Sequence, residues 1–234
     1  MIRASIPREG AAPAGNEGKK IMEEKRSNHG RGVVAIVLGA LLFLGGMGLT
    51  GYNMYDDSRA GREAYQVVQT LAAELPPQAL YAAPVPKTEE EILVEEARTL
   101  PVRTVDGKDY VGLLQFPDFE LELPVQTPYS LEALNTSPCL YAGDPYHNSL
   151  VICAHNFDSH FGRLKSMQEG DEVLFIAMDG EVFRYVLSLQ EVLQPTSVEE
   201  MVTGEDWDMT LFTCTLGGEY RVTARFVRQD DRPA

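Results

Sequence analysis

Cys214 and Arg221, within "TLFTCTLGGEYR" (210–221), are the first candidates for chemistry in this sequence. The thiolate form of cysteine is the nucleophile, and a nearby positive charge lowers the pKa of a thiol. Arginine carries that charge at any relevant pH, and its guanidinium has donors to spare for a developing oxyanion. The pair therefore predicts attack by the Cys214 sulfur on a carbonyl carbon, with Arg221 stabilising the charge that forms.

The Gly217-Gly218 pair predicts the turn that brings these two side chains together, because primed hairpin turns need positive φ. With the two glycines as the loop, Cys214 lies directly opposite Arg221, on the same face of the hairpin. The other face carries the apolar residues, where a structural cysteine is expected, so the register favours a functional Cys214 over a core thiol. Arg225 lies further along the strand and Arg228 has the opposite parity, so both are predicted to be dispensable for activity.

A cysteine nucleophile also needs a proton carrier, and histidine is suited to that task near neutral pH. His155 ends the apolar run "SLVICAH" (149–155), where a strand opens into a loop, a favoured position for catalytic groups. His147 and His160 are the other histidines on this side of the apolar N-terminal segment. For each of the three taken alone, a surface or hydrogen-bonded structural role stays open.

Four segments of the chain, in this order, resemble the sortases, the membrane-anchored cysteine transpeptidases of Gram-positive bacteria. They are "YVGLLQFPDFELELPV" (110–125), "ICAHN" (152–156), "FGRLKSMQEGDEVLF" (161–175) and "TLFTC" (210–214) with its downstream arginine. The resemblance implies that Cys214 is the nucleophile, His155 the acid and base, and Arg221 the oxyanion-stabilising residue. Ala154 stands before the histidine, where the family often has glycine.

The same resemblance implies a closed β-barrel of about eight strands and a two-step acyl transfer. Cys214 would cleave an LPxTG-like sorting signal of a secreted protein after its threonine, and the thioester would pass to an amine of a peptidoglycan precursor or a pilin. Two alternatives stay open. Water could resolve the thioester, which would make the protein a thiol hydrolase, or the barrel could be a membrane-anchored binding module without catalysis.

The elements that must position these residues are short strands from Tyr110 onward. The runs of β-branched and aromatic residues, with turn signals between them, span residues 110–116, 119–125, 149–155, 171–178, 181–193, 209–215 and 220–228. Helical pattern is confined to the brief stretches 130–135 and 161–167. Many short strands without long helices between them predict a mainly β domain, an antiparallel barrel or sandwich.

The N-terminal part of the chain predicts a membrane anchor rather than a globular domain. Residues 32–52 carry no charge over about 20 positions, which suffices for one transmembrane helix. Basic residues precede this segment and Asp56 and Asp57 follow it, so the N-terminus is expected in the cytoplasm and the rest outside the plasma membrane. A cleaved signal peptide is the rival interpretation, although no A-x-A-like site follows directly.

The expected organisation is therefore a disordered tail (1–31), a transmembrane anchor (32–55), an extracellular helix with a proline-rich and acidic stalk (56–104), and a catalytic domain (105–234). Within the helix, the spacing of Tyr65, Val68, Leu71 and Leu75 predicts an apolar stripe.

Composition narrows the partners and cofactors. The net charge of −15 disfavours binding to nucleic-acid phosphates. No cofactor is expected, and no zinc-ligand spacing occurs. Cys139 and Cys153 lie in apolar settings and are expected to be structural. Acidic residues lie before the nucleophile strand, at Glu199, Glu200, Glu205 and Asp206, but without the spacing of a calcium loop. A solvated acidic loop is favoured there over calcium binding.

Overall fold

The computed structural model describes residues 17–75, 98–202, 206–215 and 217–229. The chain divides into two compact units, Met1–Met54 and Tyr55–Ala234. The predicted stalk falls largely on residues 76–97, which lie outside the described residues, as does the start of the predicted tail.

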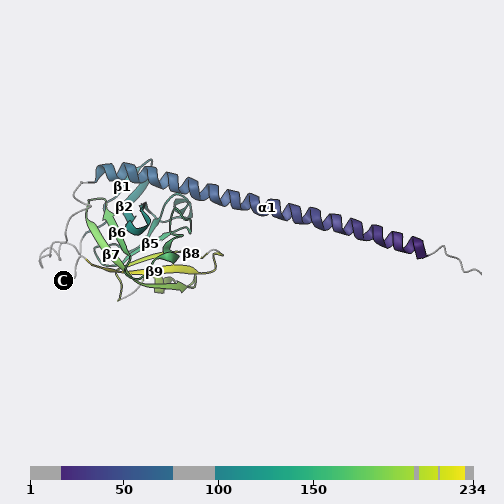
Figure 1. Ribbon diagram of the computed structural model, residues 1–234. Coiled ribbons are helices and arrows are strands. Elements are labelled where there is room, and N and C mark those ends of the chain that lie inside the picture. The colour runs from purple at the N-terminus through teal and green to yellow at the C-terminus, as the bar shows by residue number, and fades with distance from the viewer. Residues whose placement is uncertain (1–16, 76–97, 203–205, 216, 230–234) are drawn as a thin grey trace, which may run out of the picture. The chain divides into compact units, whose positions relative to one another are not determined.

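The first unit contains most of the long helix α1 (Glu17–Glu74), labelled in Figure 1. Its apolar stretch reaches a mean hydropathy of 2.4 and none of that stretch is buried. The helix is therefore long and apolar enough to cross a membrane. It begins at Glu17, earlier than the predicted anchor, because the residues that precede the apolar span are mostly good helix formers such as Glu, Lys and Met.

The described residues of the second unit form nine strands (Figure 1). They are β1 (Arg103–Val105), β2 (Lys108–Phe116), β3 (Leu121–Thr127), β4 (Cys139–Ala142), β5 (Leu150–Ala154), β6 (Glu172–Ala177), β7 (Val182–Leu193), β8 (Met209–Cys214) and β9 (Arg221–Arg228). Within the same described part, the short helices are η1 (Pro117–Phe119), α3 (Leu131–Leu134), η2 (Leu164–Ser166) and α4 (Val198–Val202).

The sheet closes into the predicted eight-stranded barrel. The order is β2-β3-β4-β5-β8-β9-β7-β6, and β6 pairs back onto β2. β1 is an additional short strand on β2. The expectation of a purely antiparallel arrangement is wrong, because β3 pairs with β4 and β5 with β8 in parallel. Parallel neighbours require a crossover connection, which here runs through α3 in one case and through β6, β7 and α4 in the other.

All seven predicted strand runs are present, and the brief helical stretches contain α3 and η2. The barrel interior is the main apolar core. It includes the inward-facing residues of β8 and β9, Met209, Leu211, Ala224 and Phe226, as the alternation in the sequence predicted.

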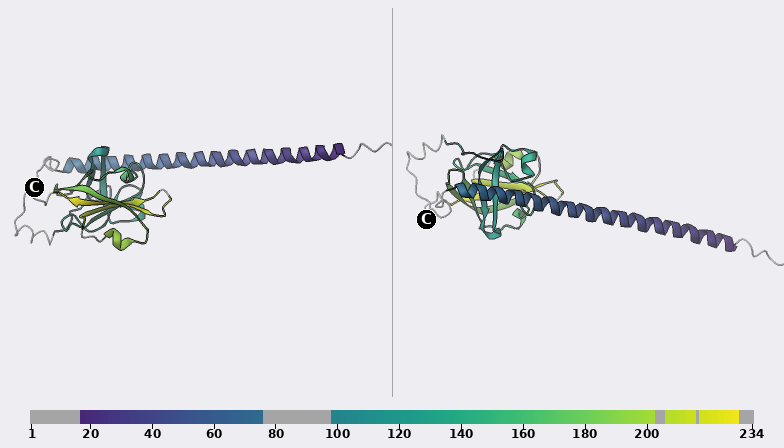
Figure 2. Two further views of the ribbon diagram at one scale, coloured as in Figure 1. Left: turned by 60° about the horizontal axis from the view of Figure 1, so that its bottom comes forward. Right: turned by 90° about the horizontal axis from the view of Figure 1, so that it is seen from above.

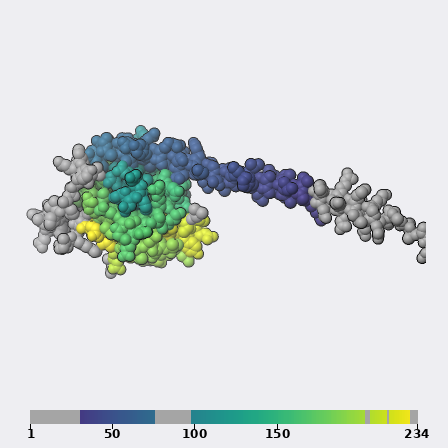
Figure 3. Space-filling view, in the orientation of Figure 1, coloured from purple at the N-terminus to yellow at the C-terminus, as the bar shows by residue number. Residues whose placement is uncertain are grey.

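The last turns of α1, from Tyr55 onward, belong to the second unit and lie across the barrel (Figures 2 and 3). Ala60, Ala64, Val68 and Leu71 form the buried stripe, whereas Tyr65 points to solvent at 64% exposure. The sequence pattern predicted Tyr65 on the buried face, but Ala60 and Ala64 lie there instead. Their small side chains let the helix approach the sheet closely. The compact unit therefore begins earlier in the chain than the predicted catalytic domain, 105–234. The boundary of that domain stays a prediction.

Candidate active site

Cys214 is the last residue of β8 and Arg221 the first of β9, and the two are directly paired across the antiparallel ladder. Both side chains are partly buried. The remaining pairs, Thr210 with Arg225 among them, also follow the predicted register. Opposed residues in such a ladder have Cβ atoms about 4.5 to 5.5 Å apart, so the sulfur and the guanidinium share one face of the sheet.

The turn that joins β8 to β9 differs from the predicted two-residue loop. The amide of Thr215 donates to the Tyr220 carbonyl (2.9 Å), and the amide of Gly218 donates to the Thr215 carbonyl (2.8 Å). Among the described residues of this loop, only Gly218 has positive φ, at 73°. A type I′ turn needs positive φ at both central positions, so the chain uses a longer loop closed by a β-turn.

This loop also holds the Arg221 side chain. The Nη1 atom donates to the carbonyls of Gly218 and Tyr220, each at 3.2 Å. The hairpin loop therefore fixes the guanidinium at the end of the ladder where the Cys214 sulfur lies.

His155 is brought beside Cys214 by the parallel pairing of β5 with β8. The register runs from Leu150 opposite Met209 to Ala154 opposite Thr213, so His155 and Cys214 are the next residues of the two strands. The buried Thr213 hydroxyl donates to the Ala154 carbonyl (2.8 Å) and ties the two strand ends together. Because the carboxyl ends of parallel strands meet at one edge, the three predicted residues come from three adjacent strand ends.

The environment of His155 favours a neutral imidazole. Burial lowers the pKa of His155 below its usual 6.5, while the charge of Asp56 opposes the shift. The Nε2 atom lies 3.3 Å from Oδ1 of Asn135, at the end of α3, and the ring packs against Phe157. With Nε2–H donating to Asn135, Nδ1 is unprotonated and can accept a proton. Asn135 lies outside the predicted site, since no motif in the sequence connects it to His155.

The other two histidines have different surroundings. His147 is exposed and its Nδ1 bonds the Asp144 carboxylate at 2.8 Å. His160 is a buried residue within the loop that follows His155, and burial lowers the pKa of His160 to about 4. Of the three candidates, only His155 continues the strand that pairs with β8.

A second apolar cluster lies on the outer face of the sheet, on the same side as Cys214. Cys139 and Cys153 face each other across β4 and β5 within it, and burial raises the pKa of both thiols, that of Cys139 to about 11. These thiols stay protonated, in agreement with their expected structural role. The Phe212 ring packs edge-to-face against Tyr141, and Tyr141 packs in the same way against Tyr129. The ring centroids lie 5.2 Å and 5.3 Å apart, respectively.

Arg225 and Arg228 are structural, which the sequence did not reveal. The Arg225 guanidinium is 1% exposed and bonds the Glu191 carboxylate (2.9 Å), the Thr210 hydroxyl (2.9 Å) and two carbonyls of α4. The Arg228 guanidinium is buried against Pro145 and Asn148. That both are dispensable for activity stays a prediction, and these contacts add the expectation that their loss costs stability.

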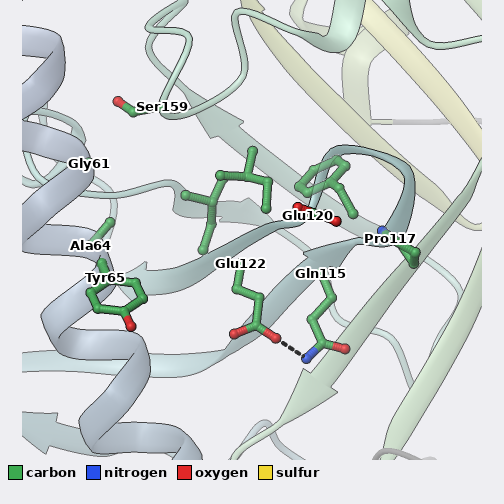
Figure 4. Close-up of a pocket in the computed structure, with 11 residues that line it drawn as sticks. Gly61, Ala64, Tyr65, Gln115, Pro117, Glu120, Glu122 and Ser159 are labelled. Atoms are coloured by element: carbon green, nitrogen blue, oxygen red, sulfur yellow. Dashed lines mark hydrogen bonds between the residues drawn. The ribbon is translucent and has the colours of Figure 1, made fainter.

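A pocket of about 590 Å³ lies between α1 and the hairpin of β2 and β3 (Figure 4). Its walls include Ala64 and Tyr65 of the helix, Glu122 of β3, and Ser159 of the loop after His155. Glu122 accepts a bond from Gln115 at its rim (2.7 Å). None of the three predicted catalytic residues lines it.

Within the described residues, no group of three or more His, Cys, Asp or Glu side chains is arranged to hold a metal ion. Glu199 and Glu200 lie in the first turn of α4, and Glu205 lies outside the described part of the chain. The solvated acidic loop, favoured from the sequence over calcium binding, stays a prediction.

Comparison with known proteins gives one family. The family model for the sortase domain matches residues 114–229. Sortase C of Streptococcus pneumoniae has the same fold, with 21% identity and a TM-score of 0.51 over 71% of this chain and 95% of that one. Sortase C of Clostridium perfringens, solved with the C-terminal cell wall sorting motif, gives 17% identity and a TM-score of 0.50 over 71% and 99%. No curated protein sequence matches.

Proposed function

Because this chain belongs to the sortase family of cysteine transpeptidases, over residues 114–229, we propose that it cleaves an LPxTG-like sorting signal through a thioester on Cys214. The observation that carries the proposal is the register. One ladder pairs Cys214 with Arg221, and the parallel neighbour of the same strand ends at Ala154, directly before His155. A nucleophile, a proton carrier and an anion-stabilising group therefore meet at one edge of the barrel.

In the first half-reaction, the Cys214 sulfur gives up its proton to the neutral His155 and attacks the carbonyl carbon of the threonine. The carbon–oxygen double bond opens to an oxyanion, which the Arg221 guanidinium stabilises by hydrogen bonding. The oxyanion then collapses, the carbon–nitrogen bond breaks, and the imidazolium of His155 protonates the departing amine. The products are a thioester on Cys214 and the free C-terminal fragment.

In the second half-reaction, an amine attacks the thioester carbonyl and passes its proton to His155, which returns it to the departing Cys214 sulfur. Two easier acyl transfers thus replace one direct amide exchange. We propose that the acceptor is an amine of a peptidoglycan precursor or of a pilin, and that the substrates are secreted proteins with a C-terminal sorting signal.

We place the apolar part of the signal on Tyr141 and Tyr129, the accessible rings of the row that begins at the buried Phe212. This row shares the sheet face of Cys214, and Tyr129 remains 42% exposed. Aromatic surface beside the nucleophile offers the contact area that an extended apolar peptide requires.

We further propose that α1 anchors the protein in the plasma membrane once, with the N-terminus in the cytoplasm and the barrel outside. The apolar stretch and its basic upstream flank support this orientation. In intact Gram-positive cells, protease added outside should remove the barrel. Recovery of a soluble secreted protein that starts near residue 60 would instead establish a cleaved signal peptide.

The reaction itself is tested with the full chain in detergent, a labelled sorting-signal peptide, and an added amine. We expect cleavage after threonine and, with the amine present, a ligated product. Cleavage with only free acid as product, at any amine concentration, would identify a hydrolase, and absence of cleavage across a library of sorting signals would reject the proposed activity.

A further inference from the structure

The loop that begins at His155 is fastened by a residue of α1. The Asp57 carboxylate Oδ1 accepts the Ser159 amide (3.0 Å) and also the Ser159 hydroxyl, which lies within bonding distance of the Asp57 carbonyl as well (3.0 Å). Both residues belong to the compact unit that starts at Tyr55. Hydrogen bonds to an ionised carboxylate are roughly twice as strong as bonds between neutral groups, so Asp57 can hold the loop firmly against α1.

The helix can reach the loop only because residue 61 is glycine. A Cβ atom on Gly61 would lie 2.8 Å from the Cβ atom of Ser159, closer than such atoms approach in proteins. Glycine inside a helix costs about 1 kcal/mol relative to alanine. The close contact with Ser159 gives this unfavourable residue a physical reason.

The loop passes the restraint back to His155 through its own backbone. The amide of Phe161 donates to the His155 carbonyl (3.2 Å), and the amides of His160 and Gly162 both donate to the Phe157 carbonyl (2.9 and 2.8 Å). Phe161 is buried in the barrel core, in the same cluster as Ala64 of α1. Fixing Ser159 therefore fixes a tightly bonded turn whose first residue carries the imidazole.

We propose that Asp57 is a positioning residue for the transpeptidase, and that the final turns of α1 are part of the catalytic unit. The clamp from Asp57 to Ser159 holds the His155 loop in the geometry that proton transfer requires. The proposal rests on the catalytic role proposed for His155, and it gives the segment just after the membrane-spanning stretch a task beyond tethering.

The test uses the full chain in detergent with three main variants, and Gly61→Ala is a fourth. Asp57→Ala removes the acceptor, whereas Asp57→Asn keeps an Oδ1 that can still accept the Ser159 amide. Glu74→Ala is the matched control, because it removes the same charge from the same helix at an exposed and weak ion pair with Arg103 (3.7 Å). Peptide cleavage gives kcat and KM, and hydrogen exchange gives the protection of residues 155–163.

We expect Asp57→Ala to lower kcat by about 10-fold with little change in KM, because a misplaced proton carrier slows chemistry and leaves peptide binding intact. Hydrogen exchange in residues 155–163 should speed up in the same variant. Asp57→Asn should restore most of both properties, and Glu74→Ala should match the unmodified protein. A merely structural role would raise KM and lower kcat together, in step with the melting temperature.

Unchanged exchange in the loop of Asp57→Ala would overturn the clamp, and faster exchange with unchanged kcat would overturn the positioning role. If the unmodified chain cleaves no sorting peptide, the proposed function fails, and exchange in Asp57→Ala still decides whether the clamp exists. Gly61→Ala is a second test of the clamp between Asp57 and Ser159. Slower turnover despite the better helix former supports the clamp, whereas an active and more stable variant contradicts it.

Discussion

His160 is predicted to make the barrel sensitive to acid. Its side chain is 1% exposed, and neither ring nitrogen has a hydrogen-bond partner among the described residues. Burial, with a smaller effect of the charge on His155, lowers the pKa of His160 from 6.5 to about 4, and Asp57 opposes the shift. The unfolded chain takes up this proton below about pH 6.5, whereas the folded chain resists it until about pH 4.

The sign and size of the effect follow from that difference. The contribution of neutral His160 to the free energy of unfolding is fully present above the pKa of the unfolded chain. It is lost as the pH falls through the pKa of the folded chain. Each unit of pKa shift corresponds to about 1.4 kcal/mol. Acidification from about pH 7 to about pH 4 should therefore lower the free energy of unfolding by about 3 kcal/mol through His160. His160→Leu removes the titrating group and should flatten the pH dependence by that amount, whatever its effect on stability at neutral pH.

Urea unfolding of the full chain in detergent, between about pH 7 and about pH 4, measures the slope. Trp207 is the only tryptophan in the chain and contacts Arg225, so its fluorescence reports on the barrel rather than on the apolar helix. His147→Leu is the matched control, because His147 is exposed, and it should keep the acid sensitivity. If His160→Leu loses stability as steeply as the unmodified protein, the reasoning about His160 is refuted.

Substitutions at three further residues test the site and its support. Arg221→Ala should lower kcat by about 10²- to 10³-fold with little change in melting temperature, and Arg221→Lys should also be poor because an ammonium lacks the planar fork; an active Arg221→Ala enzyme would remove this residue from the mechanism. Arg225→Ala should lower the free energy of unfolding by about 2 to 4 kcal/mol in circular dichroism, since it leaves Glu191 and two α4 carbonyls without their donor, and an equally stable variant would contradict the network. Asn135→Ala should lower kcat about 10-fold by freeing the ring of His155, and an unchanged pH–rate profile with unchanged kcat would exclude that contact.

The hairpin of the site could be predicted from sequence because its determinants are local. Alternation of side chains and a Gly-Gly turn suffice to place Cys214 opposite Arg221, even though the loop itself is longer than predicted. The pairing of β5 with β8 could not be derived in this way. It joins segments far apart in the chain, and only the resemblance to a family connected His155 with Cys214.

The features that sequence reasoning missed depend on contacts between distant elements. Tyr65 fits the spacing of an apolar stripe, but its side chain is exposed. The helix packs so close to the barrel that the small side chains of Ala60 and Ala64 fill the contact instead. Arginine is usually a surface residue. Arg225 is buried because α4 folds over it and supplies carbonyl acceptors. β4 has four residues, too few for a clear period, and owes its place to β5.

The central claim is that Cys214 forms the thioester, and intact-mass spectrometry of the full chain after mixing with a sorting-signal peptide tests it most directly. We predict an adduct with the mass of the acyl fragment that ends in threonine, located on Cys214 by fragmentation and released by hydroxylamine. Cys214→Ala should give no adduct, whereas Cys139→Ala and Cys153→Ala should retain it. An adduct on either buried cysteine, or peptide cleavage by Cys214→Ala, would contradict the account.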